Sequence, residues 1–139
     1  MVRVIMGSRG GGKTKKMVEL ITGAAQDETG NVIALEKGNK LAGDIHARTA
    51  RLIDTQEYEI RSYQVLRGFI TGLYAGNYDI SHIFIDSVFK IAACDDMGEF
   101  ERFLEWINRF GEKNGISFTI TASADESMAN EGIKKYFSL

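Results

Sequence analysis

The stretch Gly-Ser-Arg-Gly-Gly-Gly-Lys-Thr, residues 7–14, directly follows a short apolar run at Val2–Met6. It fits the pattern G-x-x-x-x-G-K-S/T at every fixed position. Such a loop binds phosphates when it joins a buried strand to a helix, because consecutive backbone N–H groups then converge on the anion. We therefore expect a strand at Val2–Met6, a phosphate-binding loop at 7–14 (hereafter the glycine loop) and a helix from Lys13 to about Ala25.

Each side chain of the glycine loop has an expected role. Gly7 and Gly12 allow backbone angles that a Cβ would block, so their role is shape. The Lys13 ammonium is expected to contact β- and γ-phosphate oxygens, and the Thr14 hydroxyl to bind Mg²⁺. The residues expected to bind the nucleotide are Gly7, Ser8, Arg9, Gly10, Gly11, Gly12, Lys13, Thr14 and Lys15. The alternative is a glycine-rich turn that binds nothing.

The composition is that of an ordinary globular protein. With 139 residues, 26% charged and 44% hydrophobic, the chain suits one domain with its own core. The formal net charge of −2 gives no global attraction to nucleic acid or anionic membranes. Cys94 is the only cysteine, so no internal disulfide is possible, and no apolar run approaches the roughly 20 residues that span a bilayer. Without a charged-then-apolar leader, a cytoplasmic location is predicted.

Apolar runs alternate with helical periodicities along the whole sequence. Strands are predicted at Val2–Met6, Val32–Leu35, Tyr58–Tyr63, His82–Asp86 and Ile116–Ala122. Helices are predicted at 13–25, over Leu41, Ile45, Thr49, Leu52 and Ile53, at 65–74, at 100–110, and from Asp125 through Ile133. This alternation predicts one three-layer α/β/α sandwich, residues 1–139, with a mainly parallel five-stranded sheet.

Asp86 gives the second strong signal, because it ends the apolar strand that begins at His82. An acidic side chain at that position can hold a water of the Mg²⁺ shell that Thr14 contacts. Taken alone, an apolar strand ending in Asp more often marks a turn or a helix cap. Behind a complete glycine loop, we interpret it as part of a metal site.

In these two stretches the chain resembles P-loop NTPases: Gly7–Thr14 resembles their Walker A motif and Ile83–Asp86 their Walker B strand. Within that superfamily it resembles the RecA-like, ASCE branch, because a further strand pair, Val32–Leu35 and Tyr58–Tyr63, lies between the motifs. The resemblance implies that the fifth strand inserts between the Walker A and Walker B strands. The implied order, numbered along the sequence, is 3-2-4-5-1, with all strands parallel.

The resemblance also implies roles at the strand ends. Thr121 and Ser123, at the end of the fifth strand, would lie near the γ-phosphate as sensors. Glu36, at the end of the second strand, would orient the attacking water; the alternative is a solvated glutamate in a turn. Many relatives carry Glu after the Walker B Asp where this chain has Ser87, which predicts slow hydrolysis.

These observations predict an Mg²⁺-dependent ATP-binding protein that hydrolyses ATP slowly or on stimulation by a partner, with Lys13, Glu36 and Asp86 as catalytic residues. The alternatives are a nucleoside or nucleotide kinase and a non-hydrolysing switch or accessory factor. The absence of an Asn-Lys-x-Asp motif disfavours GTP. No arginine finger can be chosen among Arg48, Arg51, Arg61, Arg67, Arg102 and Arg109. His46 and His82 lack a second ligand and predict no metal site.

One edge of this sheet is expected to need a cover. The strand Val2–Met6 would have no neighbour on its outer side, and an unpaired apolar edge invites association. Tyr136–Leu139 could fold back there as a sixth strand, or a second protomer or protein partner could dock. The sequence does not imply a nucleic-acid partner.

Overall fold

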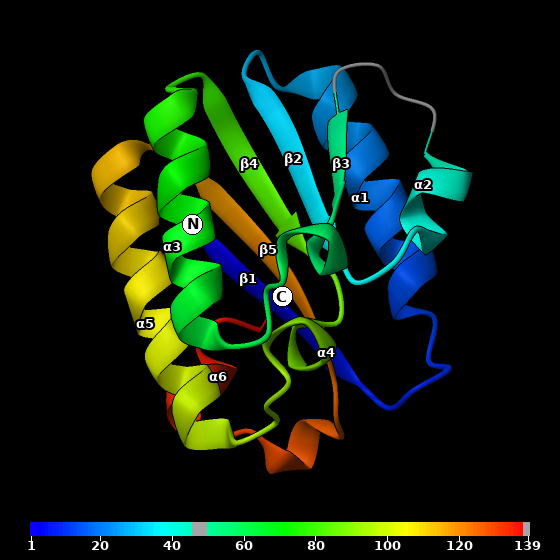
Figure 1. Ribbon diagram of the computed structural model, residues 1–139. Coiled ribbons are helices and arrows are strands. Elements are labelled where there is room, and N and C mark those ends of the chain that lie inside the picture. The colour runs from blue at the N-terminus through cyan, green and yellow to red at the C-terminus, as the bar shows by residue number, and fades with distance from the viewer. Residues whose placement is uncertain (46–49, 138–139) are drawn as a thin grey trace.

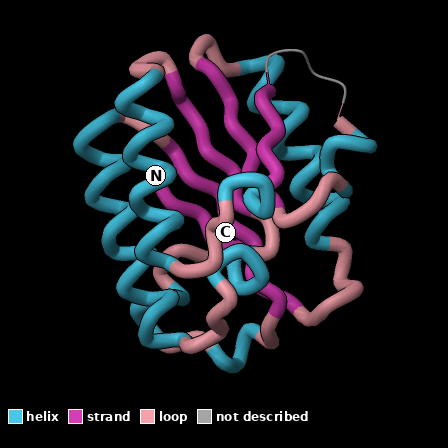
Figure 2. The backbone as a smooth tube through the Cα atoms, viewed as in Figure 1, coloured by secondary structure: helices cyan, strands magenta, loops and turns pink. Residues whose placement is uncertain are grey.

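In the computed structural model, residues 1–45 and 50–137 are described, and they form a parallel β-sheet between two layers of helices (Figures 1 and 2). The strands are β1 Val2–Gly7, β2 Asn31–Glu36, β3 Ala50–Asp54, β4 Ile80–Ile85 and β5 Ser117–Ser123. The α-helices are α1 Lys13–Asp27, α2 Lys40–Asp44, α3 Tyr63–Gly76, α4 Val88–Ala92, α5 Met97–Asn114 and α6 Glu131–Lys134. Two 3-10 turns, η1 Thr55–Tyr58 and η2 Glu126–Met128, complete the elements.

The strand order is β1-β5-β4-β2-β3, and every pairing is parallel. The predicted class, an α/β sandwich with a parallel five-stranded sheet, is confirmed. Read from the β3 edge, the strands follow the sequence-numbered order 3-2-4-5-1, but the detail differs because the third strand is built from other residues than predicted.

The predicted helix over Leu41 to Ile53 is wrong. Helix α2 ends at Asp44, and Ala50–Asp54 forms the edge strand β3. The apolar positions that matched a helical face also match a strand whose successive side chains point to opposite faces: Leu52 packs with the α1 side of the sheet and Ile53 with the α3 side. Thr49 lies outside the described residues.

The predicted strand Tyr58–Tyr63 is also wrong, because this segment holds a turn and the start of α3. Asp54 caps η1 by accepting a hydrogen bond from the Gln56 amide at 2.9 Å, and Glu59 adopts a left-handed conformation with φ of 56°. The Ser62 hydroxyl then accepts from the Val65 amide at 3.1 Å and begins α3. In this segment the alternation of apolar and polar residues comes from two successive cap residues, Asp54 at η1 and Ser62 at α3, and not from a strand.

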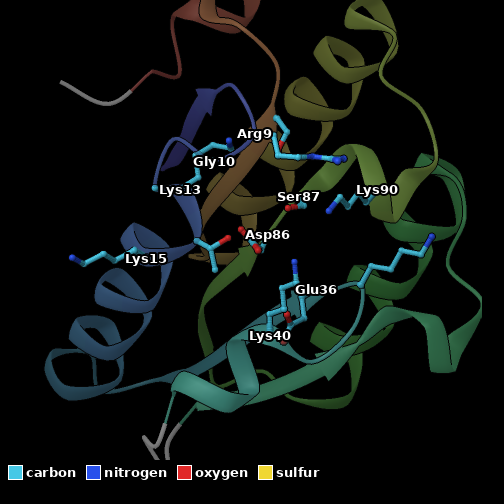
Figure 3. Close-up of a pocket in the computed structure, with 13 residues that line it drawn as sticks. Arg9, Gly10, Lys13, Lys15, Glu36, Lys40, Asp86, Ser87 and Lys90 are labelled. Carbon is cyan, nitrogen blue, oxygen red and sulfur yellow. The ribbon is translucent and has the colours of Figure 1, made fainter.

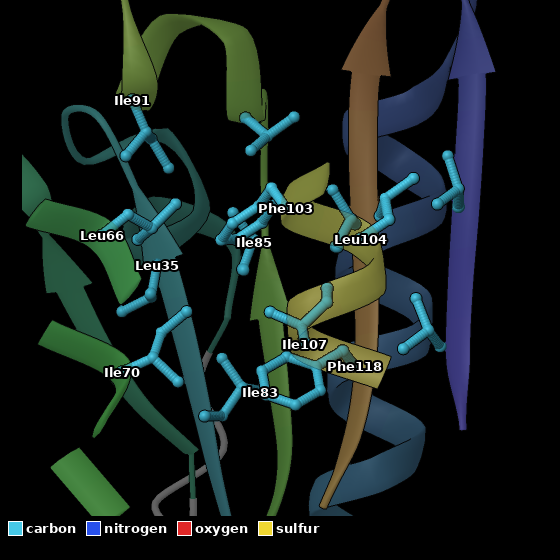
Figure 4. Packing of buried hydrophobic residues seen from close by; sticks show 14 of the residues in the cluster. Leu35, Leu66, Ile70, Ile83, Ile85, Ile91, Phe103, Leu104, Ile107 and Phe118 are labelled. Atoms are coloured by element: carbon cyan, nitrogen blue, oxygen red, sulfur yellow. The ribbon is translucent and has the colours of Figure 1, made fainter. Parts of the chain in front are cut away.

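The sheet separates two cores. Helices α3 and α5 cover one face and α1 with α2 covers the other (Figure 1). In β2, Ile33 and Leu35 face the first core while Val32 and Ala34 face the second, as the two-residue period of a strand requires. The labelled residues of the first core are Leu35, Leu66, Ile70, Ile83, Ile85, Ile91, Phe103, Leu104, Ile107 and Phe118 (Figure 4). Because both faces of the sheet are packed against helices, the carboxyl ends of its strands are held in fixed relative positions.

Among the described residues, the C-terminal segment meets the β1 edge at Val4. The Val4 amide donates to the Tyr136 carbonyl at 2.8 Å, and Val4 forms an isolated parallel bridge with Phe137. The described part of the predicted sixth strand therefore pairs with β1 through one bridge, and Ser138 and Leu139, the rest of that prediction, lie outside the described residues. Asp125 caps only η2, and Asn130 caps the separate helix α6. Across residues 1–45 and 50–137, no helix has the length and apolar character needed to cross a membrane.

Candidate functional site

A cavity of about 340 Å³ opens at the carboxyl edge of the sheet (Figure 3). Four strands deliver residues to it, because in a parallel sheet all carboxyl ends meet at the same edge. The cavity is lined by Arg9, Gly10, Gly12, Lys13, Thr14, Lys15, Glu36, Lys37, Lys40, Asp86, Ser87, Lys90 and Ser123. The structure thus brings together most of the predicted site residues, although Gly7, Ser8, Gly11 and Thr121 do not line the cavity.

The glycine loop turns through two left-handed residues. Gly10 and Gly12 have φ of 85° and 84°, and Gly12 is the N-cap residue that precedes α1. The Gly11 amide donates to the Ser8 carbonyl at 3.1 Å, which tightens the turn. The predicted steric need is therefore found at Gly12, while Gly10 rather than Gly7 supplies the second left-handed conformation.

Lys13 places its ammonium inside the glycine loop. The Nζ atom donates to the carbonyl oxygens of Gly7 and Ser8, both at 2.8 Å. An ammonium has three hydrogens, so one donor remains for a further acceptor. Partial burial lowers the pKa of Lys13, and the negative charge of Asp86 opposes that shift. Lys13 and Asp86 thus place opposite charges on the wall of the same cavity.

Asp86 is buried and held in place by hydrogen bonds. It is 6% exposed, and its Oδ1 atom accepts a hydrogen bond from the Thr121 hydroxyl at 2.6 Å. The same hydroxyl accepts from the Ser87 amide at 2.7 Å, and the Asp86 amide donates to the Leu35 carbonyl at 2.9 Å. Ser87 adopts a left-handed conformation with φ of 56°. These contacts fix the carboxylate against β5 and leave Oδ2 without a hydrogen bond from residues 1–45 and 50–137.

Thr121 lies behind Asp86 and is fully buried, with its hydroxyl engaged both as donor and as acceptor. Its observed role is to position Asp86. That Thr121 also senses a γ-phosphate stays a prediction, as does the corresponding role of Ser123, which does line the cavity.

Glu36 is buried at the end of β2 with 5% exposure, so it is not the solvated turn residue of the alternative interpretation. Its Oε1 atom accepts from the Leu41 amide at 3.0 Å, and Oε2 accepts from the Leu41 and Ala42 amides at 3.1 and 3.3 Å. The carboxylate therefore caps α2. Burial raises its pKa, the Asp86 charge adds to that effect, and the amide hydrogen bonds oppose it.

The cavity carries a surplus of positive charge. Its ionisable residues are the cations Arg9, Lys13, Lys15, Lys37, Lys40 and Lys90 and the carboxylates Glu36 and Asp86. Focused cationic potential in a concave site attracts polyanions such as phosphates. Lys37, Lys40 and Lys90 were not predicted, although their positions just after the two strand-end carboxylates were a usable signal.

The oxygen donors suit Mg²⁺ better than a metal held by protein ligands alone. The described part of the chain contains no group of three or more His, Cys, Asp or Glu side chains that could hold a metal ion. Mg²⁺ needs no such cage, because it commonly takes one or two protein oxygens and completes its shell with waters and ligand phosphates. Asp86 and Thr14, which both line the cavity, carry oxygen ligands of that kind.

The residues left unassigned by the sequence also find places. Arg51, Arg61, Arg67, Arg102 and Arg109 do not line the cavity, whereas Arg48 and His46 fall outside the described residues. His82 sits within the fold: Nδ1 lies 2.8 Å from the Glu28 carboxylate and Nε2 lies 2.8 Å from the Thr119 hydroxyl.

In comparisons with known proteins, no protein-family model and no curated protein matches this chain.

Proposed function

We propose that the chain is a P-loop NTPase of the RecA-like type that binds ATP with Mg²⁺ and hydrolyses it slowly or when a protein partner stimulates it. The observation that carries the proposal is the meeting, in one cationic cavity, of the glycine loop with its Lys13 ammonium and the buried Asp86 carboxylate. Polar groups fixed in advance around a concave site are what charge stabilisation requires.

The roles follow from the geometry. The amides of the glycine loop and the remaining Lys13 donor hold the β- and γ-phosphates, with the N-terminus of the 15-residue helix α1 adding its dipole. Thr14 and Asp86 would hold Mg²⁺, with Thr121 fixing the Asp86 carboxylate. The bound metal would neutralise phosphate charge and favour attack on phosphorus.

Hydrolysis forms a bond between a water oxygen and the γ-phosphorus and breaks the bond from phosphorus to the bridging oxygen. The electron pair of the broken bond stays on ADP, and the proton of the water passes to Glu36 and then to solvent. Oε1 accepts one amide hydrogen bond and keeps a lone pair for that water, whereas Oε2 already accepts from two amides. Because the carboxylate serves both the α2 cap and the water, we expect slow turnover.

The hydrogen bonds of Glu36 to the start of α2 favour a second candidate, a nucleotide switch without hydrolysis. Both Glu36 oxygens are committed to the α2 cap, and Ser87 stands next to Asp86 without a carboxylate. In that case a partner would read the bound state through α2, and Glu36 would be a structural residue only.

Titration calorimetry and thermal denaturation with ATP, ADP and GTP, each with and without Mg²⁺, test the binding step. We expect ATP with Mg²⁺ to raise the melting temperature most, because a ligand that binds only the native state stabilises it by mass action. Phosphate release measured on the same samples tests hydrolysis. The absence of binding heat with every triphosphate would reject the proposal.

Two substitutions at Glu36 separate the hydrolase from the switch. Glu36→Gln keeps a carbonyl oxygen for the α2 cap but removes the base, so a hydrolase should lose on the order of 10²-fold in turnover with ATP affinity retained. If the protein is a switch, wild type and Glu36→Gln both bind ATP and release no phosphate, and Glu36→Ala costs about 1 kcal/mol of stability because the α2 cap is lost. Asp54→Asn is the control, because Asp54 likewise ends a strand and accepts from two amides, Gly38 and Gln56, without lining this cavity.

A further inference from the structure

Lys90 enters the cavity from the side opposite the glycine loop. It belongs to the short helix α4, which begins two residues after Asp86. Figure 3 shows its side chain extending toward Ser87, with the Arg9 side chain reaching from the glycine loop toward the same side and Lys13 lying on the other side. A ligand held by the glycine loop would therefore meet Lys90 on its far side.

The backbone that carries Lys90 is firmly anchored. Three other residues of α4 pack into the core: Val88, Ile91 and Ala92 are 0%, 0% and 2% exposed. The Lys90 amide donates to the Ser87 carbonyl at 3.0 Å. Ser87 is itself tied to Thr121, which also holds Asp86. The backbone of Lys90 and the carboxylate of Asp86 therefore belong to one hydrogen-bonded group that includes Ser87 and Thr121.

The charge of Lys90 is not neutralised by a carboxylate. Among the residues that the structure describes, the salt bridges join His82 to Glu28 and Lys134 to Glu131, and none includes Lys90. Lys13, by contrast, spends two donors on carbonyls of the glycine loop. An exposed lysine commonly loses its charge to solvent screening, but one that lines a concave cationic cavity acts on whatever anion enters.

We propose that the Lys90 ammonium binds the γ-phosphate oxygens of the bound triphosphate and neutralises the charge that develops there during hydrolysis. The inference rests on the proposed function and adds a catalytic residue to it. Lys90 transfers no proton and forms no covalent bond; it supplies, from the same chain, the positive charge that many phosphoryl-transfer sites receive from an arginine. A neighbouring molecule is then not needed to complete the site.

Two further lysines on the cavity wall define the competing explanation. Lys37 and Lys40 follow β2 and flank the Gly38 turn, where φ is 110°. If the cavity needed only a general positive field, loss of Lys37 would weaken binding of every anion as much as loss of Lys90 does. A specific γ-phosphate contact instead predicts that Lys90 distinguishes ATP from ADP.

The test compares Lys90→Gln and Lys90→Arg with Lys37→Gln and with Lys113→Gln, an exposed lysine in the last turn of α5. We expect Lys90→Gln to lower kcat on the order of 10²-fold and to weaken ATP binding while ADP affinity stays within about twofold of wild type. Lys90→Arg should recover most of the turnover, and Lys113→Gln should behave as wild type. Equal losses of ATP and ADP affinity in Lys90→Gln and Lys37→Gln would overturn the proposal.

Failure of this inference and failure of the proposed function give different results. If wild type binds and hydrolyses ATP and Lys90→Gln does so equally well, only the Lys90 role is rejected. If wild type binds ATP without hydrolysis, the ratio of ATP to ADP affinity is the readout, and Lys90→Gln should reduce it. If wild type binds no nucleotide, both proposals are rejected. Turnover per molecule that rises with protein concentration would show that a second copy supplies the charge, which also overturns the proposal.

Discussion

Two clusters of polar residues lie at different heights in the same sheet. The site cluster, Lys13, Glu36 and Asp86, lies at the carboxyl edge and faces the cavity. The histidine cluster, His82, Glu28 and Thr119, lies toward the amino ends of β4 and β5, where the His82 ring also stacks on Phe84 with ring centroids 4.0 Å apart. Burial shifts pKa values in both clusters, downward for Lys13 and His82 and upward for Glu36.

The difference between the clusters is unused hydrogen-bonding capacity. Both ring nitrogens of His82 have partners at 2.8 Å, so the histidine cluster satisfies itself. In the site cluster Lys13 retains a donor and Asp86 retains Oδ2, and both line a cavity with surplus positive charge. A shifted pKa alone therefore marks burial, whereas a shifted pKa beside unsatisfied polar atoms and an open cavity marks a functional site.

The largest expected effect comes from Lys13→Ala, which removes the central cation of the site cluster. We expect ATP affinity and turnover to fall on the order of 10²- to 10³-fold, because the phosphates lose a fixed charged donor. Calorimetry and phosphate release measure the two quantities. Lys16→Ala is the control, since Lys16 lies on the same helix but does not line this cavity. Unchanged ATP affinity in Lys13→Ala would mean that the unused hydrogen-bonding capacity of the site cluster does not mark a binding site.

A matched pair of β5 substitutions compares the clusters directly. Thr121→Val removes the hydroxyl that holds Asp86, and Thr119→Val removes the one that meets His82. Both threonines are buried, with 0% and 3% exposure respectively, so each substitution should cost about 1–3 kcal/mol by leaving polar partners unsatisfied. Only Thr121→Val should weaken the binding of Mg²⁺ and ATP, by about 10- to 100-fold.

Urea denaturation gives the stability and calorimetry the affinity for both variants. Equal effects of the two substitutions on ATP affinity would mean that Asp86 is not positioned by Thr121 for ligand binding. A Thr121→Val protein that loses stability but keeps full affinity would assign this hydroxyl to the fold alone.

Much of the fold could be predicted from sequence where the signal is local. The glycine loop fixes where β1 ends and α1 begins, and the apolar run Ile83–Ile85 of β4 is typical of a buried parallel strand. The region between α2 and α3 was mispredicted because Leu52 and Ile53 suit a helical face as well as an edge strand that packs one side chain on each face of the sheet. Caps at Asp54 and Ser62 decided the structure there, and they depend on which neighbouring amides are free.

For the candidate site, too, some features could be predicted from the sequence and others could not. Glu36 and Asp86 could be predicted to meet because strand ends share one edge of a parallel sheet, which is a property of topology. The α2 cap made by Glu36, the placement of Thr121 behind Asp86 and the approach of Lys90 could not be predicted. Each depends on side-chain directions across elements that are distant in sequence, and neither periodicity nor spacing records them.

The smallest expected effect is a pH dependence of stability that belongs to the histidine cluster alone. The Glu28 carboxylate accepts only, so Nδ1 of His82 carries a hydrogen, and the neutral ring then accepts the Thr119 hydroxyl at Nε2. Burial lowers the pKa of His82 below its ordinary value of 6.5, and the Glu28 interaction opposes that shift. The unfolded chain therefore binds the proton first as pH falls. The free energy of unfolding contributed by neutral His82 is complete above about pH 6.5 and is lost as pH falls through the folded-state pKa.

Urea denaturation of wild type and His82→Gln between pH 8 and pH 5 measures this contribution, since the difference between the two curves isolates one titrating ring. Glutamine can still donate to Glu28 and accept from Thr119 but does not titrate, so the variant should lose the part of the pH slope that wild type shows below about pH 6.5. ATP affinity should be the same in both proteins, because His82 does not line the cavity. A wild-type protein that instead gains stability relative to the variant as pH falls would show that the charge of Glu28 outweighs burial, and the histidine cluster would then be an ion pair rather than a neutral hydrogen-bonded group.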